Sequence, residues 1–131
     1  MTGLTPYLHF DGTAREALTF YRDIFGGELE LHTFADFGRT DGPRDAIAHG
    51  ELSGSVQLFG ADAGKDDVPL KVQGVMFSLL GTADPATLES WFAALAEGGE
   101  VKDPLQERPW GGHDGQVVDG FGVPWLIGYE V

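Results

Sequence analysis

The chain has 131 residues, a length that suits one compact domain, and hydrophobic residues make up 42% of it, enough for a core. Its 21 acidic and 8 basic residues give a formal net charge of −13, which argues against nucleic acid or an anionic membrane surface as a partner. That charge would attract a cationic small molecule, although plain solubility also explains it. The sequence has no cysteine, no apolar run long enough to span a bilayer and no N-terminal leader, so we expect a cytoplasmic protein without disulfides or a membrane partner.

Two stretches of the sequence, residues 12–28 and 81–100, resemble each other. Each opens with Gly-Thr-Ala, continues with apolar residues at helical spacing that include an aromatic pair, and closes with Gly-Gly-Glu. A repeat of this kind in one short chain predicts two related modules rather than a solenoid. We place the module boundary in a polar, Gly-containing segment, which gives a single domain of residues 1–131 with module one at about 1–64 and module two at about 65–131.

The first module is predicted in the order strand, helix and three strands. Residues 5–10 form the first strand, and the helix is marked by apolar residues that recur every three or four positions (Ala14, Ala17, Leu18 and Tyr21). Thr13 and Glu16 predict a capping box at its start. The remaining strands are expected at residues 28–34, 46–52 and 55–61, with a two-residue hairpin turn before the last one. The loop of residues 35–45 is long enough to cover a site.

The second module is predicted to repeat this order. Its first strand spans residues 72–80, and its helix carries Leu88, Trp91, Phe92 and Leu95, with Asp84 as the N-cap before Pro85. Three strands follow, at residues 100–106, 116–119 and 123–129. Each half therefore reads β-α-β-β-β, which predicts an α+β fold with two curved mixed sheets around a cleft between the modules.

Several stretches are similar to those of one known family, the vicinal oxygen chelate superfamily of glyoxalase I, extradiol dioxygenases and bleomycin-resistance proteins, and within it the PhnB-like branch. They cover nearly the whole chain: Pro6-Tyr7-Leu8-His9-Phe10, Ala17-Leu18-Thr19-Phe20-Tyr21, Phe25-Gly26-Gly27, Ala46-Ile47-Ala48-His49-Gly50-Glu51-Leu52, Trp91-Phe92-Ala93-Ala94-Leu95, Trp110-Gly111 and Asp119-Gly120-Phe121-Gly122-Val123-Pro124-Trp125. The resemblance implies the glyoxalase/bleomycin-resistance fold and a homodimer. The branch is often labelled demethylubiquinone methyltransferase-like, but no Gly-rich loop that could hold a nucleotide-like methyl donor follows a strand here.

The resemblance also implies four metal-ligand positions, because enzymes of the superfamily bind a divalent metal through one side chain from each of four strands. In this sequence those positions fall on Pro6, on Gln57, near Val75 and on Leu126. Metal ligands are His, Glu, Asp or similar donors, so only Gln57 could coordinate. We therefore expect no metal and no other cofactor, which argues against metal-dependent catalysis of the glyoxalase or dioxygenase type.

Strand alternation and the two predicted loops of residues 35–45 and 107–115 suggest which side chains would bind a ligand. We expect six of them to line the cleft: Leu8, Phe10, Phe37, Gln57, Phe59 and Trp110. Trp110 lies in a Gly-rich loop, where its ring could stack on a flat ligand or cover its own core, and Phe37 has the same two interpretations. By the same alternation, His9 is expected on the helix side of its sheet.

The four histidines show no spacing typical of a metal site. A polar site could still form if His9, His49 and Glu51 converge in space, although a lone histidine such as His49 is more often a hydrogen-bonded structural residue. The favoured hypothesis is a metal-free protein that binds a small, partly apolar or cationic ligand in the cleft. The alternative is a metal-dependent lyase, isomerase or dioxygenase with its site relocated to these three residues, and a third hypothesis is a module that chiefly dimerises.

Overall fold

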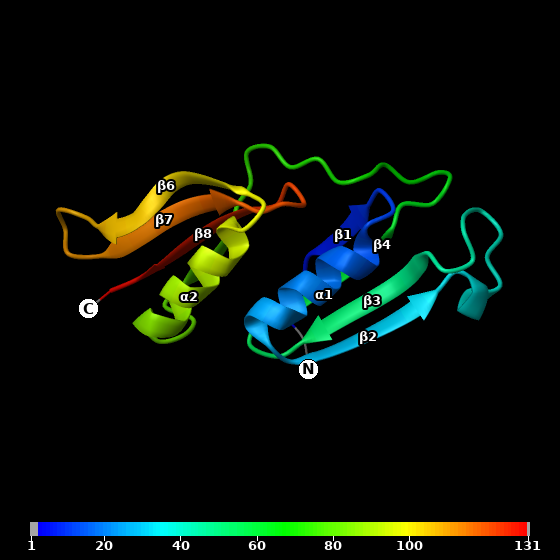
Figure 1. Cartoon of the computed structure of the whole chain (residues 1–131), viewed down its shortest axis with the longest axis horizontal. Coiled ribbons are helices and arrows are strands. Elements are labelled where there is room, and N and C mark those ends of the chain that lie inside the picture. Colours follow the sequence, from blue (N-terminus) through cyan, green and yellow to red (C-terminus); the bar gives the residue numbers. More distant parts are fainter. Residues whose placement is uncertain (1–2, 131) are drawn as a thin grey trace. The chain divides into compact units, whose positions relative to one another are not determined.

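The computed structural model describes residues 3–130 (Figure 1), and the chain divides into two compact units, Met1–Leu70 and Lys71–Val131. Each unit contains one four-stranded mixed sheet and one long helix, in the order β-α-β-β-β. The predicted α+β class and the repeated module are confirmed. Within residues 3–130, no helix has the length and apolar character needed to cross a membrane.

The first unit begins with β1 (Tyr7–Phe10) and α1 (Ala14–Phe25), and continues with β2 (Glu28–Thr33), a 3-10 turn η1 (Ala35–Phe37), β3 (Ile47–Ser53) and β4 (Leu58–Asp62). The strand order across the sheet is β1-β4-β3-β2, with β1 parallel to β4 and the other pairs antiparallel. β4 begins three residues later than predicted, so the connection after β3 is longer than a two-residue hairpin and contains Gln57.

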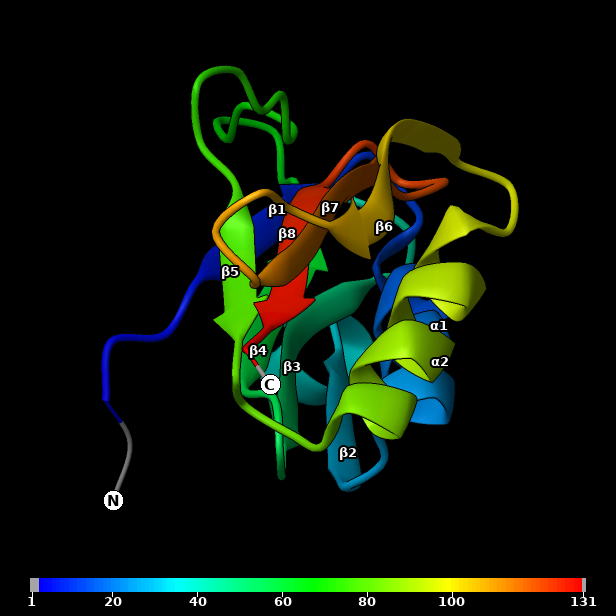
Figure 2. The ribbon, with the colours of Figure 1, turned by 90° about the vertical axis from the view of Figure 1, so that its left-hand side faces the viewer.

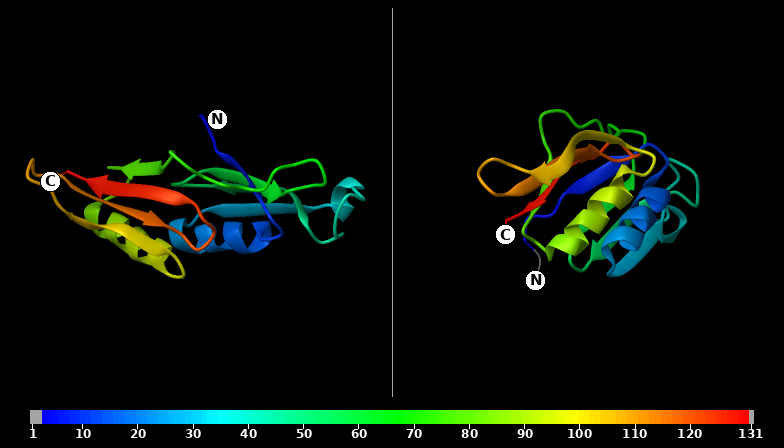
Figure 3. Two further views of the ribbon diagram at one scale, coloured as in Figure 1. Left: turned by 90° about the horizontal axis from the view of Figure 1, so that it is seen from above. Right: turned by 60° about the vertical axis from the view of Figure 1, so that its left-hand side comes forward.

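The second unit has the same topology. It contains β5 (Phe77–Leu80), α2 (Pro85–Ala96), β6 (Glu100–Glu107), β7 (His113–Val118) and β8 (Pro124–Tyr129), and Figure 2 shows its sheet order β5-β8-β7-β6. β5 is shorter than the strand predicted at residues 72–80, because Gly74 has a φ of 74°, outside the range of extended backbone. In each unit the helix covers only one face of its sheet (Figure 3).

The helices bury the apolar residues that their spacing predicts. α1 buries five side chains (Ala14, Ala17, Leu18, Tyr21 and Phe25), and α2 buries four (Leu88, Trp91, Phe92 and Leu95). The cap of α2 is confirmed, since the Asp84 carboxylate accepts a hydrogen bond from the backbone N–H of Thr87 at 2.8 Å. The capping box of α1 is wrong: Thr13 makes no side-chain cap bond, and the Ala14 N–H instead donates to Asp62 on β4 at 2.9 Å.

The repeated Gly-Gly-Glu sequence has a steric reason in both units. A Cβ on Gly27 would collide with the carbonyl oxygen of Ser53, and a Cβ on Gly99 would collide with that of Val118. Glu28 pairs with Ser53 and Glu100 pairs with Val118, so each glycine lets the chain leaving the helix enter the sheet beside the end of a neighbouring strand. The repeated Gly-Gly-Glu sequence therefore marks the same close approach of two backbone segments in both units.

Candidate functional site

The first sheet buries Leu8 and Phe10 against α1. Their exposed fractions are 5% and 2%. A Cβ placed on Gly60 of β4 would lie 3.2 Å from the Phe10 ring and 3.5 Å from Leu18 of α1, so these side chains fill the space over that glycine. Leu8 and Phe10, which we expected to line a ligand cleft, thus belong to the helix-covered core. The alternation of β1 is shifted by one residue from the prediction, and such a shift exchanges the two faces completely.

Five side chains share the opposite face of this sheet, which no helix covers: Tyr7, His9, His49, Glu51 and Phe59. We call this surface the His49 face. Tyr7 pairs with Phe59 across β1 and β4, and Glu51 pairs with Phe59 across β3 and β4. The ring of Tyr7 lies 5.3 Å from that of His9 and 5.5 Å from that of His49, centroid to centroid. The fold therefore brings the predicted polar residues His9, His49 and Glu51 to one face, together with two further aromatic rings.

A chain of hydrogen bonds crosses the His49 face. The Tyr7 hydroxyl lies 3.0 Å from Nδ1 of His49, and Nε2 of His49 lies 3.1 Å from Oε1 of Glu51. With its proton on Nε2, the imidazole donates to the Glu51 carboxylate and accepts from the Tyr7 hydroxyl. Burial raises the pKa of Tyr7 above its ordinary value, Arg39 opposes this rise and Asp67 adds to it. The phenol therefore keeps its proton at neutral pH and points it toward His49.

The neighbouring strand β2 extends this polar surface. His32 pairs in register with His49, and its Nε2 lies 3.2 Å from Oε1 of Glu30. Phe37, from η1, stacks on the His32 ring at 5.6 Å with an interplanar angle of 18° and is 55% exposed. Phe37 is thus placed beside the His49 face, as an exposed ring rather than a lid over its own core.

The other residues of the predicted cleft are not gathered into one place within the first unit. Gln57 lies in the turn before β4 and is half-buried, while Phe59 is half-buried on the His49 face. Tyr7 was not predicted as a site residue. Strand alternation could have found it, because Tyr7 and His9 occupy the same face of β1 whichever face that is.

The residues of the His49 face do not fit the divalent metal that the family resemblance implies. Among residues 3–130, no group of three or more His, Asp or Glu side chains could hold a metal ion. Both ring nitrogens of His49 are already engaged, by Tyr7 and by Glu51. A site relocated to His9, His49 and Glu51 therefore lacks a donor set, while the metal-free state of the protein stays a prediction.

The second unit contains a pocket of about 500 Å³. Its walls include Leu80, Trp110, His113, Asp114, Tyr129 and Glu130. Trp110 is 71% exposed, and the rings of His113 and Tyr129 stack at 4.7 Å with an interplanar angle of 13°. Tyr129 donates a hydrogen bond to Glu89 of α2 at 2.6 Å, which raises the pKa of Tyr129. Within residues 3–130, Nδ1 of His113 is the one buried side-chain nitrogen or oxygen that has no hydrogen-bond partner.

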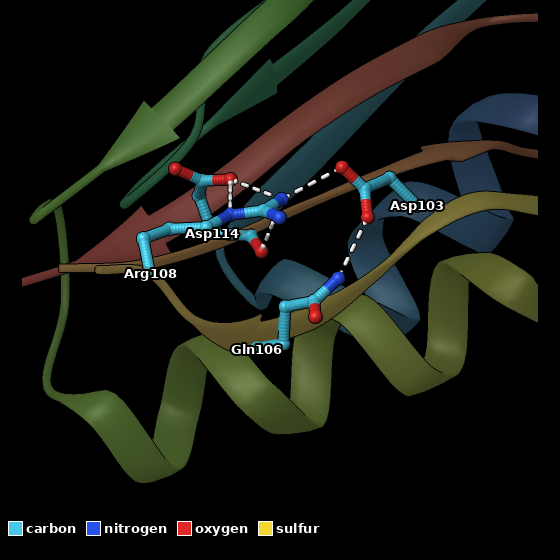
Figure 4. A network of polar contacts seen from close by, with 4 residues as sticks. All are labelled: Asp103, Gln106, Arg108 and Asp114. Carbon is cyan, nitrogen blue, oxygen red and sulfur yellow. Dashed lines mark hydrogen bonds and ion pairs between the residues drawn. The ribbon is translucent and has the colours of Figure 1, made fainter.

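A network of polar contacts anchors the loop that carries Trp110 (Figure 4). The Arg108 guanidinium bridges two carboxylates, with Nη2 2.7 Å from Asp103 and 2.7 Å from Asp114, and Gln106 donates to Asp103 at 2.8 Å. The backbone N–H of Arg108 donates to the carbonyl of Gly112 at 2.7 Å and closes the loop. Arg108 offsets part of the charge of Asp103 and Asp114, and Glu130 is the second acidic residue that lines the pocket.

Comparisons with known proteins agree with this fold. A family model described as the Glyoxalase/Bleomycin resistance protein/Dioxygenase superfamily matches residues 3–127. The chain belongs to this superfamily.

Three relatives illustrate the similarity. Protein YjdN of Escherichia coli (strain K12) is 29% identical over 140 residues, which cover 95% of this chain and 92% of that protein. The crystal structure of protein PA1353 from Pseudomonas aeruginosa has 35% identity and a TM-score of 0.81, covering 99% of this chain and 98% of that one. A PhnB protein from Bacillus cereus has 19% identity and a TM-score of 0.77, covering 98% and 99%, so it supports the fold alone. The predicted superfamily is confirmed, and the PhnB-like branch stays a prediction.

Proposed function

We propose that this protein binds a small, partly apolar or cationic organic molecule without a metal ion, in the pocket beside Trp110. The observation that carries the proposal is the Trp110 ring, 71% exposed at a pocket of about 500 Å³. A volume of this size suits a small organic ligand, and an exposed indole offers a large flat surface on which a ring can stack. The stacked rings of His113 and Tyr129 supply a second aromatic wall.

The charges around the pocket support a neutral or cationic ligand over an anionic one. Asp114 is paired with Arg108, which leaves Glu130 without an opposing charge among the residues that line the pocket. The chain as a whole carries a formal charge of −13, so anions are repelled before they arrive. An indole face also attracts cations through its ring quadrupole.

The test is a thermal-shift screen of planar aromatic compounds in cationic, neutral and anionic forms, followed by calorimetry on any compound that stabilises the protein. Trp110→Ala should weaken binding by about tenfold or more, as expected when a stacking partner worth about 1–3 kcal/mol is removed. Phe37→Ala is the matched control, because it removes a similarly exposed ring from the first unit. Equal losses in both variants, or no loss in Trp110→Ala, would contradict the proposal.

The metal-free part of the proposal has a test of its own. The support for it is the missing donor set among residues 3–130. Metal analysis of protein purified without chelators should give far less than one equivalent of zinc, nickel, manganese or iron. A stoichiometric, tightly held ion would favour the alternative, a metal-dependent lyase, isomerase or dioxygenase. A homodimer remains a proposal from the family resemblance, and sedimentation at low concentration decides it.

A further inference from the structure

We propose that Tyr7 is a nucleophile, activated by His49 and Glu51, that accepts a group from a small activated electrophile bound on the His49 face. The electrophile would be an acyl, sulfonyl or phosphoryl compound with an aromatic or apolar part. This activity lies in the first unit and is separate from ligand binding beside Trp110. The observation behind it is the hydrogen-bonded geometry of three side chains from β1 and β3.

The three side chains have the arrangement that an activated nucleophile requires. A hydroxyl lies within hydrogen-bond distance of an imidazole (3.0 Å), and a carboxylate holds the other nitrogen of that imidazole (3.1 Å). The carboxylate fixes the tautomer that leaves Nδ1 free to accept a proton, and it stabilises the imidazolium that forms. His49 is thus a general base and Glu51 its positioning residue.

Tyr7 needs such a base. Burial raises its pKa, so at neutral pH the phenol stays protonated and is a weak nucleophile on its own. Transfer of the proton to His49 during attack removes that obstacle without first forming a free phenolate. The other charged groups that act on Tyr7 are Arg39, from the segment before β3, and Asp67, from the segment after β4, and their effects on the pKa of Tyr7 oppose each other.

The surroundings of Tyr7 favour a substrate with an aromatic or apolar part. The rings of His9 and Phe59 lie 5.3 Å and 6.4 Å from that of Tyr7. Tyr7 itself is 43% exposed, so its oxygen is open to a small molecule. A flat substituent placed on these rings would bring the reactive centre to the hydroxyl.

The other two tyrosines provide references within the same molecule. Tyr129 donates its hydroxyl directly to the Glu89 carboxylate at 2.6 Å, with no imidazole between them. Tyr21 is 0% exposed under α1. Among the tyrosines of residues 3–130, Tyr7 alone combines an exposed ring with an imidazole base, so Tyr7 should react much faster than Tyr129.

The experiment uses the full chain and benzenesulfonyl fluoride as the electrophile. In the reaction, an O–S bond forms between Tyr7 and the sulfonyl group, the S–F bond breaks, fluoride leaves, and the Tyr7 proton passes to Nδ1 of His49. Peptide mass spectrometry gives the rate at each tyrosine. Tyr7 should be labelled about 10²-fold faster than Tyr129, the lower end of what a positioned base contributes.

Matched variants test the roles of His49 and Glu51 in activating Tyr7. His49→Asn should slow labelling of Tyr7 by about 10²-fold and Glu51→Gln by about tenfold. His32→Asn should leave the rate within about twofold, because the hydrogen bond of His32 goes to Glu30 and not to Tyr7. In the wild type the rate should level off at a pH well below that at which a free phenol ionises. In His49→Asn it should keep rising through about pH 10.

Two results would overturn the inference: labelling of Tyr7 no faster than that of Tyr129, or equal rates in the wild type and in both His49→Asn and Glu51→Gln. Circular dichroism and the thermal midpoint of each variant show whether it is folded. If His49→Asn does not fold, the labelling rate of Glu51→Gln and the pH profile of the wild type test the inference instead. Loss of ligand binding beside Trp110 would leave these rates unchanged, so the two proposals fail separately.

Discussion

The two units share one topology but place different chemistry on the uncovered faces of their sheets. The strand registers give the correspondence: Tyr7, His49, Glu51 and Phe59 of the first unit occupy the positions that Ser78, Asp114, Gln116 and Leu126 occupy in the second. The hydrogen-bonded chain therefore exists in the first unit alone among residues 3–130. The Asp114 position in the second unit is bound to Arg108 instead.

The helix-covered faces differ far less. Leu8, Leu52 and Leu58 of the first unit correspond to Leu79, Val117 and Trp125 of the second, and all six are buried. Burial against a helix demands an apolar side chain at each position, while the uncovered face imposes no such requirement. The two units thus share an apolar, helix-covered face, while the side chains of their uncovered faces differ.

The largest expected effect on stability concerns Gly27 and Gly99, where two backbone segments approach closely in each unit. Gly27→Ala and Gly99→Ala should each destabilise the protein by about 3 kcal/mol or more, because the new Cβ would collide with a backbone carbonyl of the next strand. Gly27→Ala should cost more, since its φ of 101° adds backbone strain. Urea denaturation measures both.

Gly26→Ala is the control for this pair. Its φ is 74°, but a Cβ there would meet nothing within 4 Å. The expected cost is about 1–3 kcal/mol and comes from backbone strain alone, since a ψ of −173° places Gly26 in a region that is essentially restricted to glycine. If all three variants lost the same stability, the steric account of the Gly-Gly-Glu repeat would be wrong.

The next effect concerns the buried carboxylates. Asp62 accepts the backbone N–H groups of Ala14 and Ile47, whereas Asp119 accepts those of Phe121 and Val123 and the indole N–H of Trp125. Replacement by Ala leaves these donors without their acceptor.

We expect Asp119→Ala to lose about 3 kcal/mol and Asp62→Ala about 2 kcal/mol, in proportion to the donors left unpaired. Chemical denaturation of the two variants gives the values. Asn retains one acceptor oxygen, so each Asn variant should lie between the wild type and its Ala variant. The reverse order of the two Ala variants would contradict the count of donors.

A smaller effect is a loss of stability in acid. Hydrogen bonds from Thr33 hold the pKa of Asp36 in the first unit below its ordinary value, and hydrogen bonds from Thr87 do the same for the pKa of Asp84 in the second. A carboxyl whose folded pKa is depressed contributes stability above its unfolded pKa, and that contribution is lost as the pH falls through the folded pKa.

Thermal midpoints should therefore decline below about pH 4, and the decline should be shallower in Asp36→Asn and Asp84→Asn than in the wild type. Glu130→Gln, which replaces an exposed carboxyl, serves as the reference variant. A decline of equal slope in all four proteins would refute the assignment.

The smallest effect concerns the exposed rings. Trp110→Ala and Phe37→Ala should each change the free energy of unfolding by no more than about 0.5 kcal/mol, since both rings are mostly in solvent. Differential scanning calorimetry checks this. A loss of several kcal/mol in Trp110→Ala would mean that the ring covers its own core, and the proposed ligand pocket would then lose its main support.

Helical periodicity and the capping residues at the ends of elements predicted much of the scaffold from the sequence. The spacing of apolar residues identified the buried stripes of both helices, and Asp84 before Pro85 located the start of α2. The Asp119 carboxylate accepts a hydrogen bond from the N–H of Phe121 in the turn that directly follows it. These features depend on residues a few positions apart, so local sequence contains their cause.

Sequence reasoning failed where a distant residue decides the outcome. The capping box at Thr13 did not form because Asp62, from β4, takes the Ala14 N–H. Alternation along β1 predicted that Leu8 and His9 lie on opposite faces of the sheet, but not which face the helix covers. Both residues were therefore assigned to the wrong face. Periodicity cannot say which face a helix will cover, because that depends on the pairing of β1 with β4, about 50 residues away.

By itself, the sequence determined the α+β scaffold, its repeat and the residues of the helical cores, since each follows from short-range spacing and backbone sterics. Only the tertiary structure brought the hydroxyl of Tyr7 to the ring of His49, a contact that spans 42 positions of the chain and joins strands that are not neighbours in the sheet. Hydrogen bonds between side chains depend on the strand register, on the face of the sheet and on the rotamers together. The local pattern of residues determines none of these.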